Sequence, residues 1–171
     1  MKNLELKFKC RDFKQAYKAL NELGAAYNGV LNQLDVYFNI KPGRLKLRSI
    51  NNNEHQLIYY KRANYKGSKV SNYFIEKIKD PKHVIRILRD IYGIKTVINK
   101  KRILYIFKNT RIHIDYVKGL GKFIELEIVC KKRIEELNAQ KQMAMLKDLF
   151  KVNTGNIIKY SYSVLMISRK G

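Results

Sequence analysis

Residues 3–10 read Asn-Leu-Glu-Leu-Lys-Phe-Lys-Cys, a strict alternation of polar and apolar side chains. This alternation predicts a β-strand, because successive side chains of a strand point to opposite faces of its sheet. One face of the strand would carry only polar groups and the other only apolar groups. The same division recurs at residues 44–48, 111–116 and 124–128. We therefore expect four strands to present charged side chains from one face.

Eight segments in all show the strand period, and turn-forming residues such as Gly43 and Gly119 lie between them. They comprise residues 3–10, 36–39, 44–50, 55–62, 70–78, 96–107, 111–117 and 123–129. Eight strands accompanied by few helices favour an antiparallel barrel.

Three segments instead show the helical period, at residues 12–24, 80–93 and 132–150. Each of the first two begins with an Asp in the N-cap position and ends with a Gly. The pattern as a whole predicts an α+β, mainly β fold. Its expected form is an eight-stranded antiparallel closed barrel with the helices packed outside.

The composition limits the class of protein. The 171 residues include 36 Lys and Arg against 14 Asp and Glu, a formal charge of +22, and 46% are hydrophobic. That apolar content can bury one core, which excludes an intrinsically disordered chain. No linker-like stretch or internal repeat divides the sequence, so we expect a single domain over residues 1–171. Cys10 and Cys130 lack the spacing of a disulfide framework or a zinc site.

The sequence also bears on location and partners. No apolar run approaches the ~20 residues that cross a bilayer, and Glu5 falls where a signal peptide needs apolar residues. We therefore expect a cytoplasmic protein. The positive charge points to a polyanion, and on charge alone a nucleic acid, a phospholipid surface and a polyphosphate all stay open. Whether the chain forms a homodimer stays open as well.

The charged faces of the strands allow two interpretations. They could meet water while the apolar faces pack on an inner core, as in many antiparallel sheets. Two observations favour the opposite orientation: charges of both signs follow each other on one strand, as at Glu5 and Lys7, and three amphipathic helices need an apolar surface to cover. With the helices outside, the charges point inward. An eight-stranded barrel would then enclose a hydrophilic tunnel with space for one small ligand.

A tunnel lined by charges has to hold a highly charged ligand, metal ions or both, because burying unpaired charges is costly. Arg and Lys in a fixed array suit the oxygens of a polyphosphate. Lys100 and Arg102 share one side of their strand, which favours the tunnel over a solvated basic run or a nucleic-acid contact. The carboxylates Glu5, Glu125 and Glu127 suit Mg²⁺ or Mn²⁺, which prefer oxygen ligands.

The first strand resembles the N-terminal signature of the CYTH domain proteins, or triphosphate tunnel metalloenzymes. That signature is Glu-x-Glu-x-Lys, and residues 3–7 here read Asn-Leu-Glu-Leu-Lys. Asn3 in place of the first Glu resembles the branch around class IV adenylate cyclase. Further stretches that look like this branch lie at residues 35–38, 43–48, 57–62, 111–115 and 119–127.

The resemblance implies a barrel that binds a triphosphate through basic side chains and Mg²⁺ or Mn²⁺ through acidic ones. It implies catalytic roles for Glu5, Lys7, Glu125 and Glu127. The triphosphate-binding candidates are Lys7, Arg44, Lys46, Arg48, Arg62, Lys100, Arg102 and Arg111. The metal-binding candidates are Glu5, Glu125, Glu127 and Asp115. Asn3 removes one negative charge from the metal site, and His113 is assigned no catalytic role.

Two reactions fit a metal-bound triphosphate in such a tunnel. Attack of the ribose 3′-hydroxyl on the α-phosphate would give cyclic AMP and pyrophosphate, and the resemblance to class IV adenylate cyclase favours it. Attack of water on the terminal phosphate would give a triphosphatase for thiamine triphosphate, inorganic triphosphate or a nucleoside triphosphate. A third hypothesis is a non-catalytic binder of RNA or polyphosphate. ATP or another triphosphate is thus the expected partner, a nucleic acid is less favoured, and no membrane partner is expected.

Overall fold

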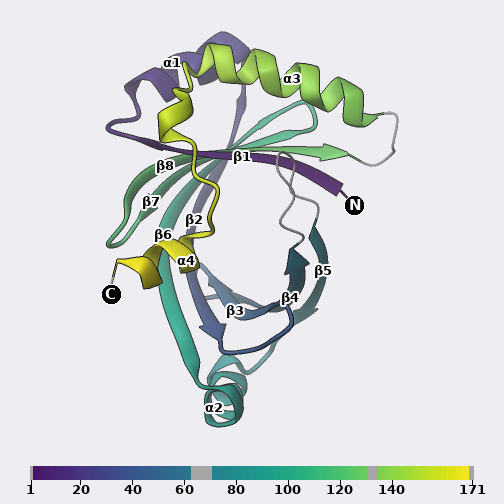
Figure 1. The fold of residues 1–171 in the computed structure, drawn as a ribbon, viewed down its shortest axis with the longest axis vertical. Coiled ribbons are helices and arrows are strands. Elements are labelled where there is room, and N and C mark those ends of the chain that lie inside the picture. Colours follow the sequence, from purple (N-terminus) through teal and green to yellow (C-terminus); the bar gives the residue numbers. More distant parts are fainter. Residues whose placement is uncertain (1, 63–70, 131–134, 170–171) are drawn as a thin grey trace.

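The computed structural model describes residues 2–62, 71–130 and 135–169. Within them, eight strands form one strongly curled antiparallel sheet (Figure 1). The strands are β1 (Lys2–Cys10), β2 (Ala26–Phe38), β3 (Arg44–Ile50), β4 (Glu54–Arg62), β5 (Ser71–Lys77), β6 (Ile94–Phe107), β7 (Thr110–Val117) and β8 (Gly121–Cys130). The predicted mainly β fold with an eight-stranded antiparallel sheet is confirmed.

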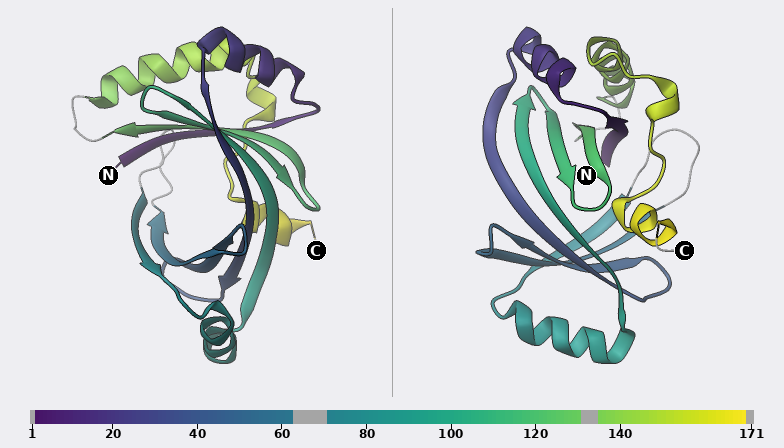
Figure 2. Two further views of the ribbon diagram at one scale, coloured as in Figure 1. Left: turned by 180° about the vertical axis from the view of Figure 1, so that it is seen from behind. Right: turned by 90° about the vertical axis from the view of Figure 1, so that its left-hand side faces the viewer.

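The order of the strands is β1-β8-β7-β6-β2-β3-β4-β5, so β1 and β5 form the two edges of the sheet. Figure 2 shows how far the sheet bends between these edges. Among the described residues no hydrogen-bonded ladder joins β1 to β5. The barrel shape therefore comes from the curl of the sheet, and hydrogen bonds do not close it there.

The described residues form four α-helices, and the first three confirm the predicted segments. They are α1 (Lys14–Leu23), α2 (Pro81–Tyr92), α3 (Glu135–Leu149) and α4 (Tyr162–Ser168), with a short 3₁₀ helix at Thr154–Asn156. Asp80 caps α2 as predicted, because its side chain accepts a hydrogen bond from the His83 amide at 3.0 Å. The predicted cap of α1 is wrong: Phe13 holds the N-cap position, and Asp12 accepts from the Lys14 amide at 2.9 Å. None of the described helices has the length and apolar character to cross a membrane.

The apolar faces of the strands point outward, and helices cover them, as predicted (Figure 1). α1 and α3 lie over β1, β7 and β8, where Leu126 and Ile128 are fully buried in one cluster with Leu20 and Leu146 of the helices. α2 covers β2 and β3 through a second cluster that includes Leu47. Each buried Leu or Ile contributes about 1.5–3 kcal/mol by leaving water. The outer surface of the sheet therefore carries most of the apolar core.

α4 closes one end of the inner face. Its Tyr162 packs with Tyr37, Ile98, Val117 and Phe123 in a third apolar cluster. The rings of Tyr162 and Phe123 meet edge to face with their centroids 5.1 Å apart. The sequence pattern does not predict α4, because seven residues carry too little periodicity.

β2 differs most from the predicted strands, since it covers Ala26–Phe38 whereas the alternation predicts only residues 36–39. Gly29 and the neighbouring asparagines break the alternation in its first half. The ladder with β6 also shifts register between Tyr27 and Val30, which marks a β-bulge or irregularity. Pairing with β6 along almost its whole length holds this part of β2 in the sheet despite the weak local pattern.

Candidate functional site

The inner faces of the strands enclose a cavity of about 530 Å³. Among the described residues, six cationic side chains and four carboxylates line it. The cations are Lys7, Lys46, Arg48, Lys100, Arg102 and Arg111, and the carboxylates are Glu5, Asp35, Glu125 and Glu127. The fully buried Asp115 accepts hydrogen bonds from Arg102 and adds a fifth carboxylate to this array. The charges thus point inward, as the alternation predicts. Opposite signs almost balance, which is the condition for keeping so many charges in a partly buried space.

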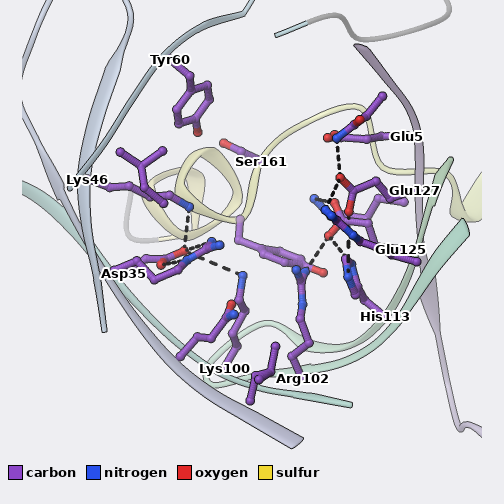
Figure 3. Close-up of a pocket in the computed structure, with 18 of the residues that line it drawn as sticks. Glu5, Asp35, Lys46, Tyr60, Lys100, Arg102, His113, Glu125, Glu127 and Ser161 are labelled. Atoms are coloured by element: carbon purple, nitrogen blue, oxygen red, sulfur yellow. Dashed lines mark hydrogen bonds and ion pairs between the residues drawn. The ribbon is translucent and has the colours of Figure 1, made fainter. Parts of the chain in front are cut away.

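Asp35, on β2, organises one side of the cavity. Its carboxylate accepts hydrogen bonds from Lys46 Nζ at 3.0 Å and from Arg48 Nε and Nη2 at 2.7 and 2.9 Å. Lys100 Nζ lies 3.8 Å from Asp35 Oδ2. Burial raises the pKa of Asp35, but the three cations outweigh burial and hold that pKa well below its usual value. Asp35 therefore stays ionised and fixes the positions of three cations (Figure 3).

Two of these cations lie almost completely out of water. Burial and the nearby Arg48 lower the pKa of Lys46 to about 8, although Asp35 opposes the shift. Burial and Arg102 lower the pKa of Lys100 well below its ordinary value. An additional anion would favour the protonated form of both side chains. This basic side, formed by Lys46, Arg48 and Lys100, is therefore suited to an anionic ligand.

Arg102, on β6, joins the two sides of the cavity. Its Nε and Nη2 each donate to an oxygen of Asp115 at 2.7 Å, and Nη2 also donates to Glu125 Oε2 at 2.6 Å. The register sets Arg102 directly opposite Asp115 on β7. The Tyr162 hydroxyl donates to Asp115 Oδ2 at 2.7 Å, which ties α4 to the cavity wall. Both oxygens of Asp115 are therefore engaged in holding Arg102 and Tyr162.

The acidic side of the cavity lies on β1 and β8, where Glu5, Glu125 and Glu127 lie close together (Figure 3). The register sets Glu5 opposite Glu127 and Lys7 opposite Glu125. Lys7 Nζ lies 3.0 Å from Glu125 Oε1. Glu127 is neutralised less well, because its cation, Arg111, lies 3.5 Å away with half of its side chain exposed. Burial raises the pKa of Glu127, and the charge of Glu125 adds to this although Arg111 opposes it. Negative charge is therefore in excess near Glu127.

His113, on β7, lies beside these two carboxylates. Its Nδ1 is 3.6 Å from Glu125 Oε2, and its Nε2 is 3.9 Å from Glu127 Oε2. Burial and the positive charge of Arg102 lower the pKa of His113 to about 4, so its ring is neutral at pH 7. Nδ1 is buried without a hydrogen-bond partner. His113 is therefore part of the cavity wall as a neutral polar group.

Oxygen donors suited to a divalent cation gather around Glu127. Asn3 Nδ2 donates to Glu127 Oε1 at 2.5 Å, and Asn3 Oδ1 is buried without a partner. In the described part of the chain, no three His, Cys, Asp or Glu side chains form a ready-made metal cluster. An unpartnered amide oxygen beside an incompletely neutralised carboxylate nevertheless fits Mg²⁺ or Mn²⁺, since such cations take oxygen ligands and Mg²⁺ usually keeps several waters. Glu5, opposite Glu127, adds a further oxygen donor to this set.

The structure brings nine of the predicted site residues to this one cavity. They are Glu5, Lys7, Lys46, Arg48, Lys100, Arg102, Arg111, Glu125 and Glu127. Asp115, the tenth, does not line the cavity but binds Arg102, which does. Arg44 instead lines a smaller cavity of about 330 Å³ along α4, with its guanidinium 5.8 Å from the Tyr60 ring centroid. Arg62 ends β4, and its side chain lies outside the described part of the structure. Asp115 and Glu125 each have a cation within 3.0 Å, whereas the nearest cation of Glu127 lies 3.5 Å away, so the metal site that we propose uses Glu127 and omits the other two.

The sequence prediction missed Asp35, Gln33 and Tyr162, which also line the cavity. Asp35 and Gln33 fall in the part of β2 that the alternation does not identify as a strand. A strand extended back from Tyr37 would have placed both on the inner face, because inward residues alternate. For Tyr162 no signal exists in the sequence, since its position depends on how α4 folds back onto the sheet.

The family model for the CYTH domain matches residues 1–162 of this chain. The chain belongs to the CYTH domain family. A relative from Methanocaldococcus jannaschii, named "Putative adenylate cyclase MJ0240", is 30% identical over 175 residues, which cover 95% of this chain and 97% of that protein.

Solved structures share the CYTH fold of this chain. The PH1012 protein from Pyrococcus horikoshii matches with a TM-score of 0.82 at 22% identity, over 96% of this chain and 99% of that one. A protein from Hippeastrum, described as revealing a dominant triphosphatase activity, matches with a TM-score of 0.66 at 15% identity. The match covers 100% of this chain and 96% of that one. At these identities the likeness establishes the fold alone.

Proposed function

We propose that this CYTH protein is a metal-dependent enzyme that cyclises ATP to cyclic AMP and pyrophosphate, with the triphosphate held in the cavity. The observation that carries the proposal is the array of buried cations that Asp35 and Asp115 hold in fixed positions. Prearranged positive charge of this kind stabilises phosphoryl oxygens without reorganisation during the reaction. The name of the relative from M. jannaschii supports ATP cyclisation as the reaction.

The cavity suits a triphosphate in size and charge. Its volume of about 530 Å³ lies within the ~300–1,000 Å³ of typical ligand pockets. Lys46 and Lys100 would contact phosphoryl oxygens as point charges, and Arg48 would do so through the planar N–H groups of its guanidinium. Because the cavity's own charges nearly balance, an entering triphosphate needs added positive charge. This supports binding together with a divalent cation.

Asn3, Glu5 and Glu127 are the residues that would hold Mg²⁺ or Mn²⁺. When bound there, the cation supplies positive charge at the phosphoryl oxygens and lowers the pKa of a coordinated hydroxyl. Arg102 lies between Asp115 and Glu125, so its guanidinium is positioned where the two sides of the cavity meet. From that position it would stabilise negative charge that develops during transfer of the phosphoryl group.

Incubation with ATP and Mn²⁺ tests the proposal, with cyclic AMP, pyrophosphate and orthophosphate measured separately. We expect cyclic AMP and pyrophosphate in equal amounts. Glu127→Gln should reduce turnover at least about 100-fold, by analogy with the loss of one charge-stabilising group in an active site. Glu22→Gln, an exposed position on α1, is the matched control and should keep full activity.

Hydrolysis of a triphosphate is the second candidate function. The triphosphatase activity described for the Hippeastrum protein, which shares the fold, favours it. Both reactions use the same cations and differ in the nucleophile, water or the ribose 3′-hydroxyl. If the same assay yields orthophosphate and no cyclic AMP, the protein is a triphosphatase and the proposed cyclisation is rejected.

The third hypothesis, a non-catalytic binder of RNA or polyphosphate, makes a separate prediction. A Glu125→Ala, Glu127→Ala double variant would then bind RNA as well as the wild type, and neither protein would show metal-dependent turnover. Loss of turnover without loss of triphosphate affinity in the double variant would instead support the enzyme.

A further inference from the structure

We propose that the cavity contains a subsite for an amino-substituted heterocycle, such as adenine, and that Gln33 accepts a hydrogen bond from its amino group. The inference rests on the proposed function and names the group that follows the triphosphate. Gln33 lines the cavity and is only 4% exposed, yet its Oε1 is buried without a hydrogen-bond partner. A buried acceptor without a donor is costly, so a ligand that brings an N–H group recovers that cost.

The position of Gln33 places this acceptor next to the cations expected to bind phosphate. The inward residues of β2 follow one another from Tyr37, at the end closed by α4, to Asp35, Gln33 and Leu31. The register sets Gln33 opposite Lys100 on β6. Gln33 therefore lies one inward position beyond the Asp35 cluster, on the side away from α4.

On β2 and β6, apolar side chains join the lining at this point. Leu31 follows Gln33 on β2, and Leu104 follows Arg102 on β6; both leucines line the cavity. Leu31 and Arg102 lie opposite each other in the β2–β6 ladder, so the two leucines are close neighbours on the inner face. A flat heterocycle needs apolar contact for its faces and a polar partner at its edge. The two leucines and Gln33 supply both.

The chemistry of the acceptor decides which heterocycle fits. An exocyclic amino group, as in adenine or a 4-aminopyrimidine, donates to an amide oxygen, and Gln pairs with adenine in this way elsewhere. An oxo group at the same ring position is an acceptor, so it would leave Oε1 unpaired. The subsite is therefore expected to prefer ATP to ITP, in which an oxo group replaces the 6-amino group. Inorganic triphosphate has no base, so its affinity should not depend on Gln33.

Dissociation constants of ATP, ITP and inorganic triphosphate, measured by calorimetry with Mg²⁺, test this inference without relying on turnover. We expect the wild type to bind ATP about tenfold more tightly than ITP, the size of one well-placed hydrogen bond. In Gln33→Met the ratio of the affinity for ATP to the affinity for ITP should fall to about one, while the affinity for inorganic triphosphate stays the same. Gln33→Glu keeps the acceptor, so it should keep the ATP preference even though its charge weakens all three ligands.

Gln142→Met is the matched control, because this glutamine lies on α3 and donates to Thr110 Oγ1 at 2.7 Å outside the cavity. It should leave the ratio unchanged. Equal binding of ATP and ITP by the wild type overturns the inference, and so does an equal loss for ATP and inorganic triphosphate in Gln33→Met. If circular dichroism shows that Gln33→Met is unfolded, the ratio of ATP affinity to ITP affinity in the wild type and in Gln33→Glu tests the inference instead. A clear ATP preference without any product would support the subsite and reject the proposed enzyme, so the two failures are distinguishable.

Discussion

Replacing Asp35 by Asn removes the single negative charge that three buried cations share. The substitution keeps the shape of the side chain, while Lys46, Arg48 and Lys100 lose their common counter-ion. Asp35 is 1% exposed, so water cannot take over its role. We therefore expect Asp35→Asn to destabilise the ligand-free protein strongly.

The size of the effect follows from the burial. Breaking a buried ion pair by removing one partner costs about 3–5 kcal/mol. The pKa of Lys46 is already lowered to about 8, so without Asp35 this side chain can release its proton near neutral pH and relieve part of the cost. We therefore expect about 3 kcal/mol, the lower end of that range. In a chain of this length each kcal/mol lowers the Tm by about 2–4 °C, which gives a decrease of about 6–12 °C.

Thermal unfolding at pH 7, followed by circular dichroism with and without inorganic triphosphate, measures this effect. Triphosphate should stabilise Asp35→Asn more than the wild type, because it brings the negative charge that the variant lacks. Asp90→Asn is the matched control: Asp90 pairs with Arg89 at 2.9 Å, but both side chains are more than half exposed. An exposed pair contributes at most about 1 kcal/mol. The prediction is refuted if Asp35→Asn has the same Tm as Asp90→Asn, or if triphosphate raises the Tm of Asp35→Asn no more than that of the wild type.

Three further predictions test the cavity by binding and stability. The pKa of Lys46 is about 8 and a bound anion raises it, so triphosphate binding should take up protons at pH 8–9 and weaken as the pH rises above 8. Calorimetry in two buffers of different ionisation enthalpy measures this proton uptake, and its absence would contradict the prediction. Lys100→Met should weaken triphosphate binding about 10- to 100-fold, whereas the exposed Lys101→Met should not, and calorimetry compares them. Folding raises the pKa of Glu127, so above that pKa the ionised carboxylate destabilises the folded state. Glu127→Gln should therefore raise the Tm at pH 7 without metal and abolish stabilisation by Mn²⁺, and a lower Tm would contradict the expected direction of the change.

The local alternation of the strands predicted most of the cavity wall. Glu5 and Lys7 on β1 and Glu125 and Glu127 on β8 lie on strands whose period is unbroken, and the inward face follows from geometry within each strand. The orientation of that face needed one additional argument, that amphipathic helices must cover the apolar side. The amphipathic helices are a signal independent of the strands, and for this reason the charged face could be identified as the inner one.

Asp35 shows where local reasoning ends. The part of β2 before Val36 owes its extended structure to the ladder with β6, whose paired residues lie between 63 (Asp35 and Ile98) and 80 (Ala26 and Ile106) positions further along the chain. The sequence of this part contains Asn and Gly, which disfavour strands. Tyr162 also depends on tertiary packing, because α4 has to return to the inner face before its hydroxyl can reach Asp115, which lies 47 residues earlier in the chain. Asp35 and Tyr162 thus escaped prediction, while the cations of the cavity did not.

The charge of the whole chain is a poor guide to the cavity. The sequence carries a formal charge of +22, yet within the described residues the six cations that line the cavity are matched by four lining carboxylates and by the buried Asp115. A ligand-free cavity has to remain near balance because unpaired buried charge opposes folding, so most of the excess lies elsewhere on the chain. Such outer charges are screened over about 8 Å at physiological ionic strength and act by raising the local concentration of anions. Selection among those anions therefore depends on the inner array that Asp35 and Asp115 hold in place.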